Sequence, residues 1–196
     1  FAAMNPCPFG DSGDASGRCR CNTQAIRRYT GRVSGPLIDR IDMHVEVPRL
    51  PHAALRGPPG ESSAVVAARV HDAREVQMAR SGVLNARLAA RELERHCTLR
   101  PADQLLLERA IERLGLSARA WHRILRVART LADLEGREGI HTAHLTEAIG
   151  YRRLDRHHHL VAAPRRRVGS QIIERLGCTR GALALEIIVA LTRIIG

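Results

Sequence analysis

The stretch SARAWHRILRVARTLADLEG, residues 117–136, carries the strongest helical pattern in the chain. It opens with Ser117, a residue type that caps helix N-termini, and closes with Gly136, a residue type that ends helices. Between them the apolar residues recur at three- and four-residue spacing: Ile124, Leu125, Ala128, Leu131 and Ala132. This spacing predicts an amphipathic helix with one buried face.

Similar patterns on both sides of this stretch predict further helices. We expect them from Ser62 or Ser63 to Arg80, over 90–97, over 101–114, and from Thr142 onward. Their short connections favour antiparallel neighbours. Aromatic residues make up 3% of the chain, so the core must consist of Leu, Ile, Val and Ala. The sequence therefore predicts a four- to five-helix bundle.

The N-terminal quarter has a different composition. Residues 1 to 24 are rich in Gly, Ser, Asp and Cys and are expected to form a loop, followed by a basic helix over 25–32. Apolar residues then alternate with polar ones from Ile41 to Val47, which predicts a half-buried strand closed by Pro48. The predicted fold class is mainly α, with one or two strands ahead of the helical bundle.

These features divide the chain into four parts. We expect a first unit over 1–48, a Pro-rich linker over 49–60, the helical bundle over 61–156 and an atypical basic and apolar tail over 157–196. The tail could dock on the bundle, lie on a partner, or result from an altered reading frame.

The net charge of +11 comes entirely from Arg, because the sequence contains no Lys. A basic surface attracts polyanions such as nucleic acid, although Arg richness can also reflect the base composition of the coding DNA. The local candidates for phosphate contact are Arg27, Arg28 and Arg32, beside Tyr29. Without Lys, no Walker A phosphate-binding loop can lie within these residues.

The start of the chain and the length of its apolar runs indicate where in the cell the protein is expected. Phe1 is followed by no secretory leader, and the longest apolar run, Ile187 to Leu191, is far too short to span a bilayer. We therefore expect a cytoplasmic protein without membrane contact. A start inside the apolar phrase Phe1-Ala2-Ala3-Met4 also suggests a piece of a longer product.

Three of the five cysteines, Cys7, Cys19 and Cys21, crowd the first segment. In a cytosolic chain, clustered thiols suggest a metal site before a disulfide. The other two, Cys97 and Cys178, are isolated and are expected to be ordinary thiols.

Three phrases, in this order, carry a family resemblance: Met4-Asn5-Pro6-Cys7-Pro8, then Gly35-Pro36-Leu37-Ile38-Asp39-Arg40-Ile41-Asp42, then Gly115 to Ala120 followed by Arg123 to Thr130. A closing phrase, Ala143 to Arg152, also fits. Together they resemble the closing half of the magnesium-chelatase-like AAA+ ATPases of the ComM/YifB group, over residues 1 to about 156. The fold implied is the end of an α/β AAA+ core followed by a helical lid.

The resemblance implies roles for single residues. Asn5 corresponds to sensor 1, which orients the attacking water; Arg40 corresponds to the arginine finger, presented to a neighbouring subunit; and Arg119 corresponds to sensor 2 on the lid. Each has a plainer alternative. Asn5 can be a turn residue, Arg40 can pair with Asp39 or Asp42 on the surface, and Arg119 can be a solvated helix residue.

The family typically has four cysteines in this first segment, a set suited to structural zinc. Here three of those places hold Cys7, Cys19 and Cys21, and Phe9 stands at the fourth. The alternatives are a zinc site with an incomplete ligand set and a metal-free loop.

The activity implied by resemblance is ATP hydrolysis coupled to DNA remodelling, such as branch migration, by a ring of identical subunits, expected to be a hexamer. ATP and Mg2+ would be held by a missing N-terminal half, so the chain alone is expected to be inactive. The alternative functions are a non-enzymatic, basic helical module that binds nucleic acid and a domain that serves assembly only.

Overall fold

The computed structural model describes residues 2–10, 12, 17–47, 56–58 and 60–152. Among these residues are seven α-helices and one short 3-10 helix, η2 (Asn85–Arg87). The α-helices are α1 (Thr23–Thr30), α2 (Gly35–Arg40), α3 (Ser63–Ser81), α4 (Ala90–His96), α5 (Pro101–Leu114), α6 (Ala118–Leu134) and α7 (Thr142–Gly150). The predicted mainly α fold is confirmed; the tail over 157–196 lies outside the described residues.

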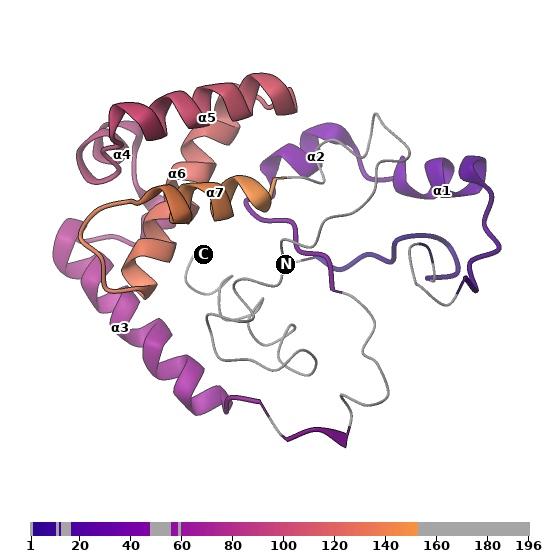
Figure 1. Cartoon of the computed structure of the whole chain (residues 1–196), viewed down its shortest axis with the longest axis horizontal. Helices are drawn as coiled ribbons and strands as arrows, with labels where there is room; N and C mark the ends of the chain where they lie inside the picture. Colours follow the sequence, from indigo (N-terminus) through magenta and orange to yellow (C-terminus); the bar gives the residue numbers. More distant parts are fainter. Residues whose placement is uncertain (1, 11, 13–16, 48–55, 59, 153–196) are drawn as a thin grey trace.

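Helix α6 is the centre of the bundle. It contacts α3, α4, α5 and α7, and Figure 1 shows these helices arranged around it. Its predicted apolar face is buried: Ile124 and Leu125 are at most 6% exposed, and Ala128 and Ala132 are fully buried. Burying a side chain such as Ile or Leu contributes about 1.5–3 kcal/mol each, so this face stabilises the whole bundle.

Glycine and proline set several helix ends in the bundle. Gly82 and Gly115 follow α3 and α5 with φ angles of 69° and 61°, a left-handed conformation that glycine adopts without the steric cost of a Cβ. Pro101 occupies the first turn of α5, where its missing N–H costs no helical hydrogen bond.

The strand predicted over 41–47 is wrong: these residues form no strand, and Asp42 lies in a bend. Met43 and Val45 pack against the helical core, which accounts for the alternating apolar pattern. The backbone N–H of His44 donates to the carbonyl of Tyr151 at 2.9 Å, so the segment lies along the end of α7. A strand needs a neighbouring strand for its hydrogen bonds, and the described residues provide none.

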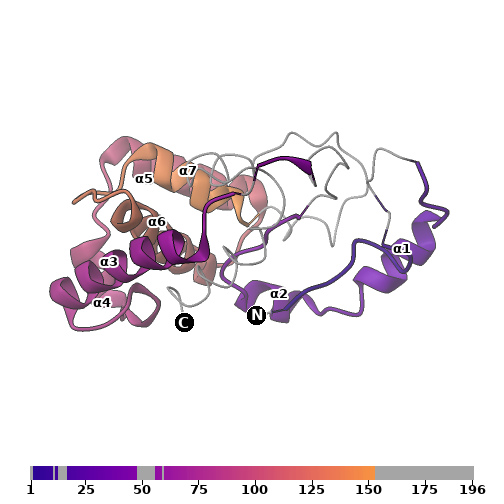
Figure 2. The ribbon, with the colours of Figure 1, turned by 90° about the horizontal axis from the view of Figure 1, so that it is seen from below.

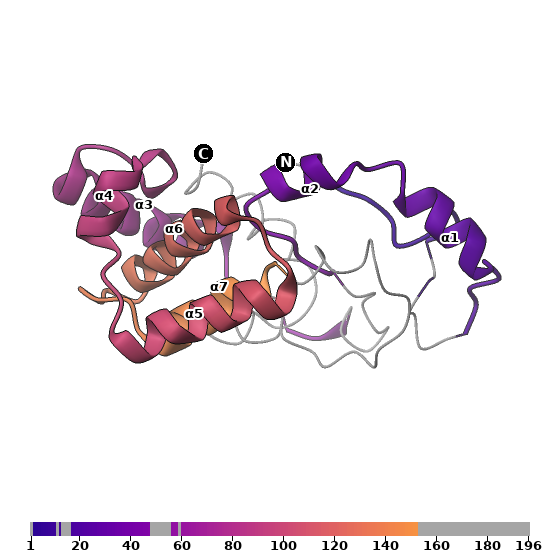
Figure 3. The same ribbon diagram turned by 90° about the horizontal axis from the view of Figure 1, so that it is seen from above.

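The sequence pattern also gave no sign of α2, because Ser34, Gly35 and Pro36 suggest a break between elements. Proline lies in the first turn of α2, where its fixed φ angle suits a helix start. Figures 2 and 3 show α1 lying away from the bundle, with α2 between them along the chain.

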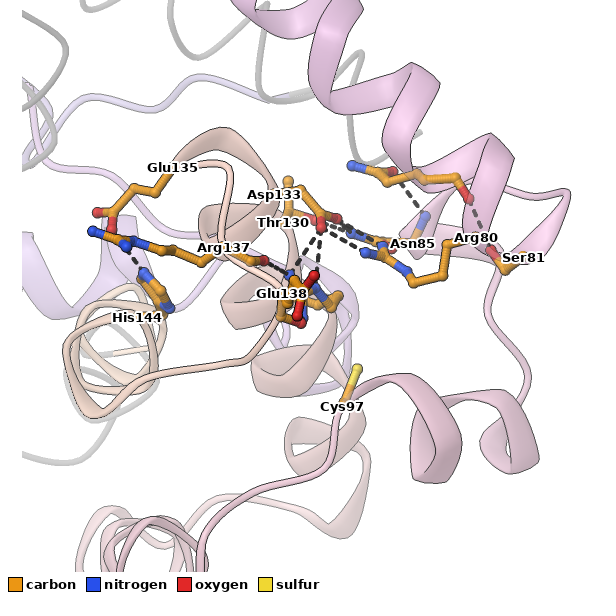
Figure 4. Close-up of polar contacts among 12 residues, drawn as sticks. Arg80, Ser81, Asn85, Cys97, Thr130, Asp133, Glu135, Arg137, Glu138 and His144 are labelled. Carbon is orange, nitrogen blue, oxygen red and sulfur yellow. Dashed lines mark hydrogen bonds and ion pairs between the residues drawn. The ribbon is translucent and has the colours of Figure 1, made fainter.

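A buried polar network joins α3, η2 and α6 around Asp133, whose side chain is 0% exposed. Arg80 donates to both carboxylate oxygens at 2.6 and 2.7 Å, and Asn85 donates at 2.8 Å. Arg129, which is 1% exposed, donates to the same carboxylate at 3.1 Å and to the carbonyl of Glu138 at 2.6 Å. Figure 4 shows Arg80 and Asn85 directed at Asp133. The network fixes η2 against the central helix.

No helix among the described residues combines the length and the apolar character needed to cross a membrane.

Candidate functional site

The segment that contains Arg40 is held against the bundle by polar contacts to α6 and to the end of α7. The Asp39 carboxylate accepts a hydrogen bond from the Ser117 hydroxyl at 2.8 Å. It also pairs with the buried guanidinium of Arg152 at 3.4 Å. Arg152 also donates to the carbonyl of Ile41. One buried arginine therefore bonds both the Asp39 side chain and the Ile41 backbone.

A second arginine holds the same segment from α6. Arg123 donates to the carbonyl of Arg40 at 2.7 Å and forms an ion pair with Asp42. The five residues Asp39, Asp42, Ser117, Arg123 and Arg152 are called the clamp below. The clamp joins residues far apart in the sequence: Asp39 lies 78 positions from Ser117 and 113 positions from Arg152.

The contacts of the clamp exclude one of the two interpretations of Arg40, its pairing with Asp39 or Asp42. The structure pairs Asp39 with Arg152 and Asp42 with Arg123, so the alternative in which Arg40 pairs with one of these carboxylates does not hold. The Arg40 guanidinium instead donates to the carbonyl of Pro36 in its own helix at 3.3 Å. Its side chain is exposed at the C-terminal end of α2, from which it can reach outward.

Arg119 lies in the first turn of α6, two residues after the clamp residue Ser117. It is exposed, and among the described residues it has neither an ion pair nor a hydrogen-bonding partner for its side chain. The clamp therefore joins the segment that presents Arg40 to the helix start that presents Arg119.

Asn5 is not part of this arrangement. It is exposed in the N-terminal loop, and a Cβ at Gly10 would lie 3.8 Å from its side-chain Nδ2. Within the described part of the chain, Asn5 makes no hydrogen bond to Arg40 or Arg119. The structure places Asn5 beside the cysteine loop, and its sensor role stays a prediction.

The three cysteines of the N-terminal segment converge. The sulfur atoms of Cys7, Cys19 and Cys21 all lie within 4.8 Å of one another, and those of Cys7 and Cys19 are 3.9 Å apart. All three are free thiols. These are ligand types and spacings that can hold a soft metal ion.

The surroundings of the three thiols differ. Burial tends to raise the pKa of Cys7, but the N–H groups of Ser12 and Phe9 and the other two thiols outweigh this effect and lower it to about 7. Burial and the neighbouring Cys7 raise the pKa of Cys21 to about 11. The Cys7 thiol, with its lowered pKa, therefore ionises more readily than that of Cys21.

The predicted nucleic-acid residues lie together at the other end of the molecule from the bundle. Arg27 and Arg28 are exposed in the last turn of α1, and Arg32 is exposed just after it. No residue of α1 is buried, so its arginine side chains are not committed to a core.

Sequence reasoning missed three residues of the clamp. Ser117 precedes α6 as predicted, yet its hydroxyl does not cap the helix and bonds Asp39 instead. Arg123 and Arg152 are inconspicuous in an arginine-rich chain. Arg152 is fully buried, and a buried guanidinium that pairs with a carboxylate 113 positions away is a signal that only the folded chain reveals.

Comparison with known proteins gives a consistent result. Residues 1–55 match the magnesium chelatase subunit ChlI family, and residues 60–152 match the C-terminal domain of the same subunit. Competence protein ComM of Haemophilus influenzae is 48% identical over 157 residues, which are 79% of this chain and 30% of that protein. Protein YifB of Salmonella typhimurium, described as uncharacterised, is 45% identical over 158 residues, 80% of this chain and 31% of that protein.

YifB of Escherichia coli is also 45% identical, over 79% of this chain and 31% of its own length. The chain thus spans about 30% of the length of the curated relatives that it matches. With both ChlI-type regions matched in order and this level of identity, the chain belongs to the magnesium-chelatase-like family that includes ComM and YifB.

Proposed function

We propose that the chain acts as the nucleotide-responding part of a cytoplasmic AAA+ ATPase that assembles as a ring, expected to be a hexamer, and remodels DNA. In this proposal Arg40 reaches the nucleotide of a neighbouring subunit, while Arg119 and Asn5 act on the nucleotide of their own subunit. The phosphate-binding lysine must come from outside these residues, because they contain no Lys.

The observation that carries the proposal is the clamp. It connects Asp39 and the Arg40 backbone to the first two turns of α6 through Ser117 and Arg123. The two exposed arginines, Arg40 and Arg119, are therefore presented from one connected unit. An ATPase ring needs this kind of link, because a residue that senses one nucleotide must be coupled to a residue that acts on the next.

The residue types suit the chemistry. Phosphoryl transfer spreads negative charge over the phosphate oxygens, and a planar guanidinium with a permanent charge meets these oxygens with directed hydrogen bonds. The bound Mg2+ would neutralise part of the same charge. Arg40 and Arg119 have the exposure that such contacts need, and the Asn5 amide could orient a water molecule.

A domain exchange tests the proposal. Residues 1–152 would replace the matching region of Haemophilus influenzae ComM, and Mg2+-dependent ATP turnover would be measured in the hybrid and in the 196-residue chain alone. We expect no turnover by the chain alone and turnover by the hybrid. Arg40→Ala and Arg119→Ala should each reduce kcat of the hybrid by a factor of about 10² or more, since each removes a charge-stabilising group.

The matched control is Arg109→Ala, which removes an exposed arginine from α5 and should leave turnover unchanged. Mixed rings separate the two roles. Arg40→Ala subunits mixed with subunits that lack the phosphate-binding lysine should regain ATP turnover. The lysine-deficient subunit still carries Arg40 and supplies it to the nucleotide bound by the neighbouring Arg40→Ala subunit. Arg119→Ala subunits should not be rescued in this way. Equal rescue of both would contradict the assigned roles.

A second candidate function is DNA binding through α1, favoured by its exposed Arg27 and Arg28 and by Arg32 beside it. The triple substitution of these residues by Ala should weaken binding of the chain to DNA similarly for all sequences. It should also lower the slope of log affinity against log salt by up to about 0.9 for each phosphate that the chain no longer neutralises. Binding that is unchanged by the substitutions would exclude α1 as the contact surface.

A further inference from the structure

Helix α2 has an inner and an outer face. Ile38 and Asp39 are half-buried, and the Asp39 carboxylate is held by the clamp. Pro36, Leu37 and Arg40 are exposed. Residues three or four positions apart lie on the same face of a helix, so these three exposed residues form the outer face. The helix lies at the edge of the ribbon in two views (Figures 2 and 3).

Leu37 is the large apolar residue of this outer face. Met43 and Val45, later in the same segment, pack against the helical core, whereas Leu37 is 50% exposed. Single exposed leucines are common on protein surfaces, so exposure alone identifies no contact. The informative feature is the position of Leu37, which lies one helical turn before Arg40.

This spacing ties the surroundings of Leu37 to those of Arg40. The Cβ atoms of residues three positions apart in a helix are separated by about 5–6 Å. For Arg40 to contact a phosphate that another subunit holds, α2 must approach that subunit to within the length of one side chain. Leu37 is then covered by the surface of the same subunit.

The clamp makes α2 a firm support for both side chains. Arg123 donates to the backbone carbonyl of Arg40 at 2.7 Å, and the Ser117 hydroxyl donates to the Asp39 carboxylate at 2.8 Å. The backbone that carries Leu37 and Arg40 is therefore fixed to the bundle. A contact at Leu37 restricts the positions that the Arg40 guanidinium can take.

We propose that Leu37 is a positioning residue that docks on the neighbouring subunit, a second copy of the same protein, and thereby sets Arg40 against the phosphates bound there. This inference rests on the proposed function of Arg40. The neighbouring surface must offer an apolar contact beside its nucleotide site, because covering Leu37 with polar groups gains no hydrophobic stabilisation. The exposed hydrogen bond from Arg40 to the Pro36 carbonyl, 3.3 Å long, gives way to the phosphate contact.

The test uses the ATPase hybrid proposed above. Leu37→Ser should lower kcat about tenfold or more, because displacing a catalytic group by about 1 Å can cost a factor of about 10². KM for ATP should stay within about a factor of two, since the subunit that binds ATP keeps its own contacts. Leu37→Met, which retains an apolar side chain of similar volume, should keep kcat within about a factor of two.

Leu105→Ser is the matched control. Leu105 is a leucine of α5 that is 45% exposed, and its substitution should leave kcat unchanged. Urea unfolding of the 196-residue chain serves as the second control. Leu37→Ser should leave the unfolding midpoint unchanged, because an exposed side chain contributes little to the stability of its own chain.

Mixed rings show in which direction Leu37 acts. Leu37→Ser subunits mixed with subunits that lack the phosphate-binding lysine should regain ATP turnover, as expected for Arg40→Ala. The lysine-deficient subunit presents an intact Leu37 and Arg40 to the nucleotide of its Leu37→Ser neighbour. If Leu37 served only the folding or the nucleotide site of its own subunit, mixing would restore nothing.

Two results would overturn this inference alone. The first is a hybrid whose turnover depends on Arg40 but is the same for Leu37→Ser as for Leu105→Ser. The second is a loss of turnover in Leu37→Ser that mixing does not restore. A hybrid without turnover, or one that Arg40→Ala leaves unchanged, contradicts the proposed function itself and removes the basis of the inference with it.

Discussion

Replacing Asp133 by Ala should destabilise the bundle strongly, because this carboxylate compensates two arginines. Arg80 donates to it at 2.6 and 2.7 Å, and Arg129 donates at 3.1 Å. Removing one partner of a buried ion pair costs about 3–5 kcal/mol, since the remaining charge is left uncompensated without regaining water.

The structure indicates the lower end of this range. The Arg80 side chain is 21% exposed and can turn toward solvent. Arg129 is 1% exposed, but it keeps its hydrogen bond to the carbonyl of Glu138 at 2.6 Å. We therefore expect a loss of about 3 kcal/mol in the free energy of unfolding. For a chain of this size that corresponds to a fall of about 6–12 °C in Tm.

Urea unfolding followed by far-UV circular dichroism measures the loss, with thermal unfolding as a second readout. Glu94→Ala is the matched control, because it removes an exposed carboxylate from α4 and should change stability by less than about 0.5 kcal/mol. Asp133→Asn keeps the shape of the side chain and should fall between the two. A loss for Asp133→Ala no larger than that of the control would refute the reasoning.

Two further predictions concern the polar contacts of the bundle. Burial alone would raise the pKa of Asp103, but hydrogen bonds from the Thr142 hydroxyl and from Arg100 lower it below its ordinary value of 3.8. The unchanged chain should therefore be more stable than Asp103→Asn at neutral pH, and this difference should disappear as the pH falls below that ordinary value. Urea unfolding of both chains from neutral to acidic pH measures the difference. A difference that stays constant with pH would contradict the lowered pKa of Asp103. Arg123→Ala removes a charged donor from the clamp, worth about 1.5–3 kcal/mol, so hydrogen exchange of the amides over 37–47 should accelerate while that of α3 stays unchanged. Equal exchange rates of these amides in the unchanged chain and in Arg123→Ala would show that the clamp does not hold residues 37–47.

The sequence by itself determined the helices of the bundle and the order of its elements. The apolar spacing in 117–136 predicted α6 and its buried face, and the predicted ranges to Arg80 and over 101–114 place the ends of α3 and α5 to within one residue. These features depend on interactions within a few residues, such as side-chain periodicity and backbone conformation, and a local pattern records them. The cysteine spacing likewise indicated which thiols converge.

Only the tertiary structure decided what the segment at 41–47 packs against and how the charges pair. Alternating apolar residues fit a strand, yet Met43 and Val45 lie against helices. Arg40 lies within two positions of both Asp39 and Asp42 in the sequence, but the partners that these carboxylates adopt are Arg152 and Arg123. Charge pairing acts through space and carries no sequence period. In an arginine-rich chain, only the folded position of residues 39–42 beside α6 and the end of α7 selects the partners.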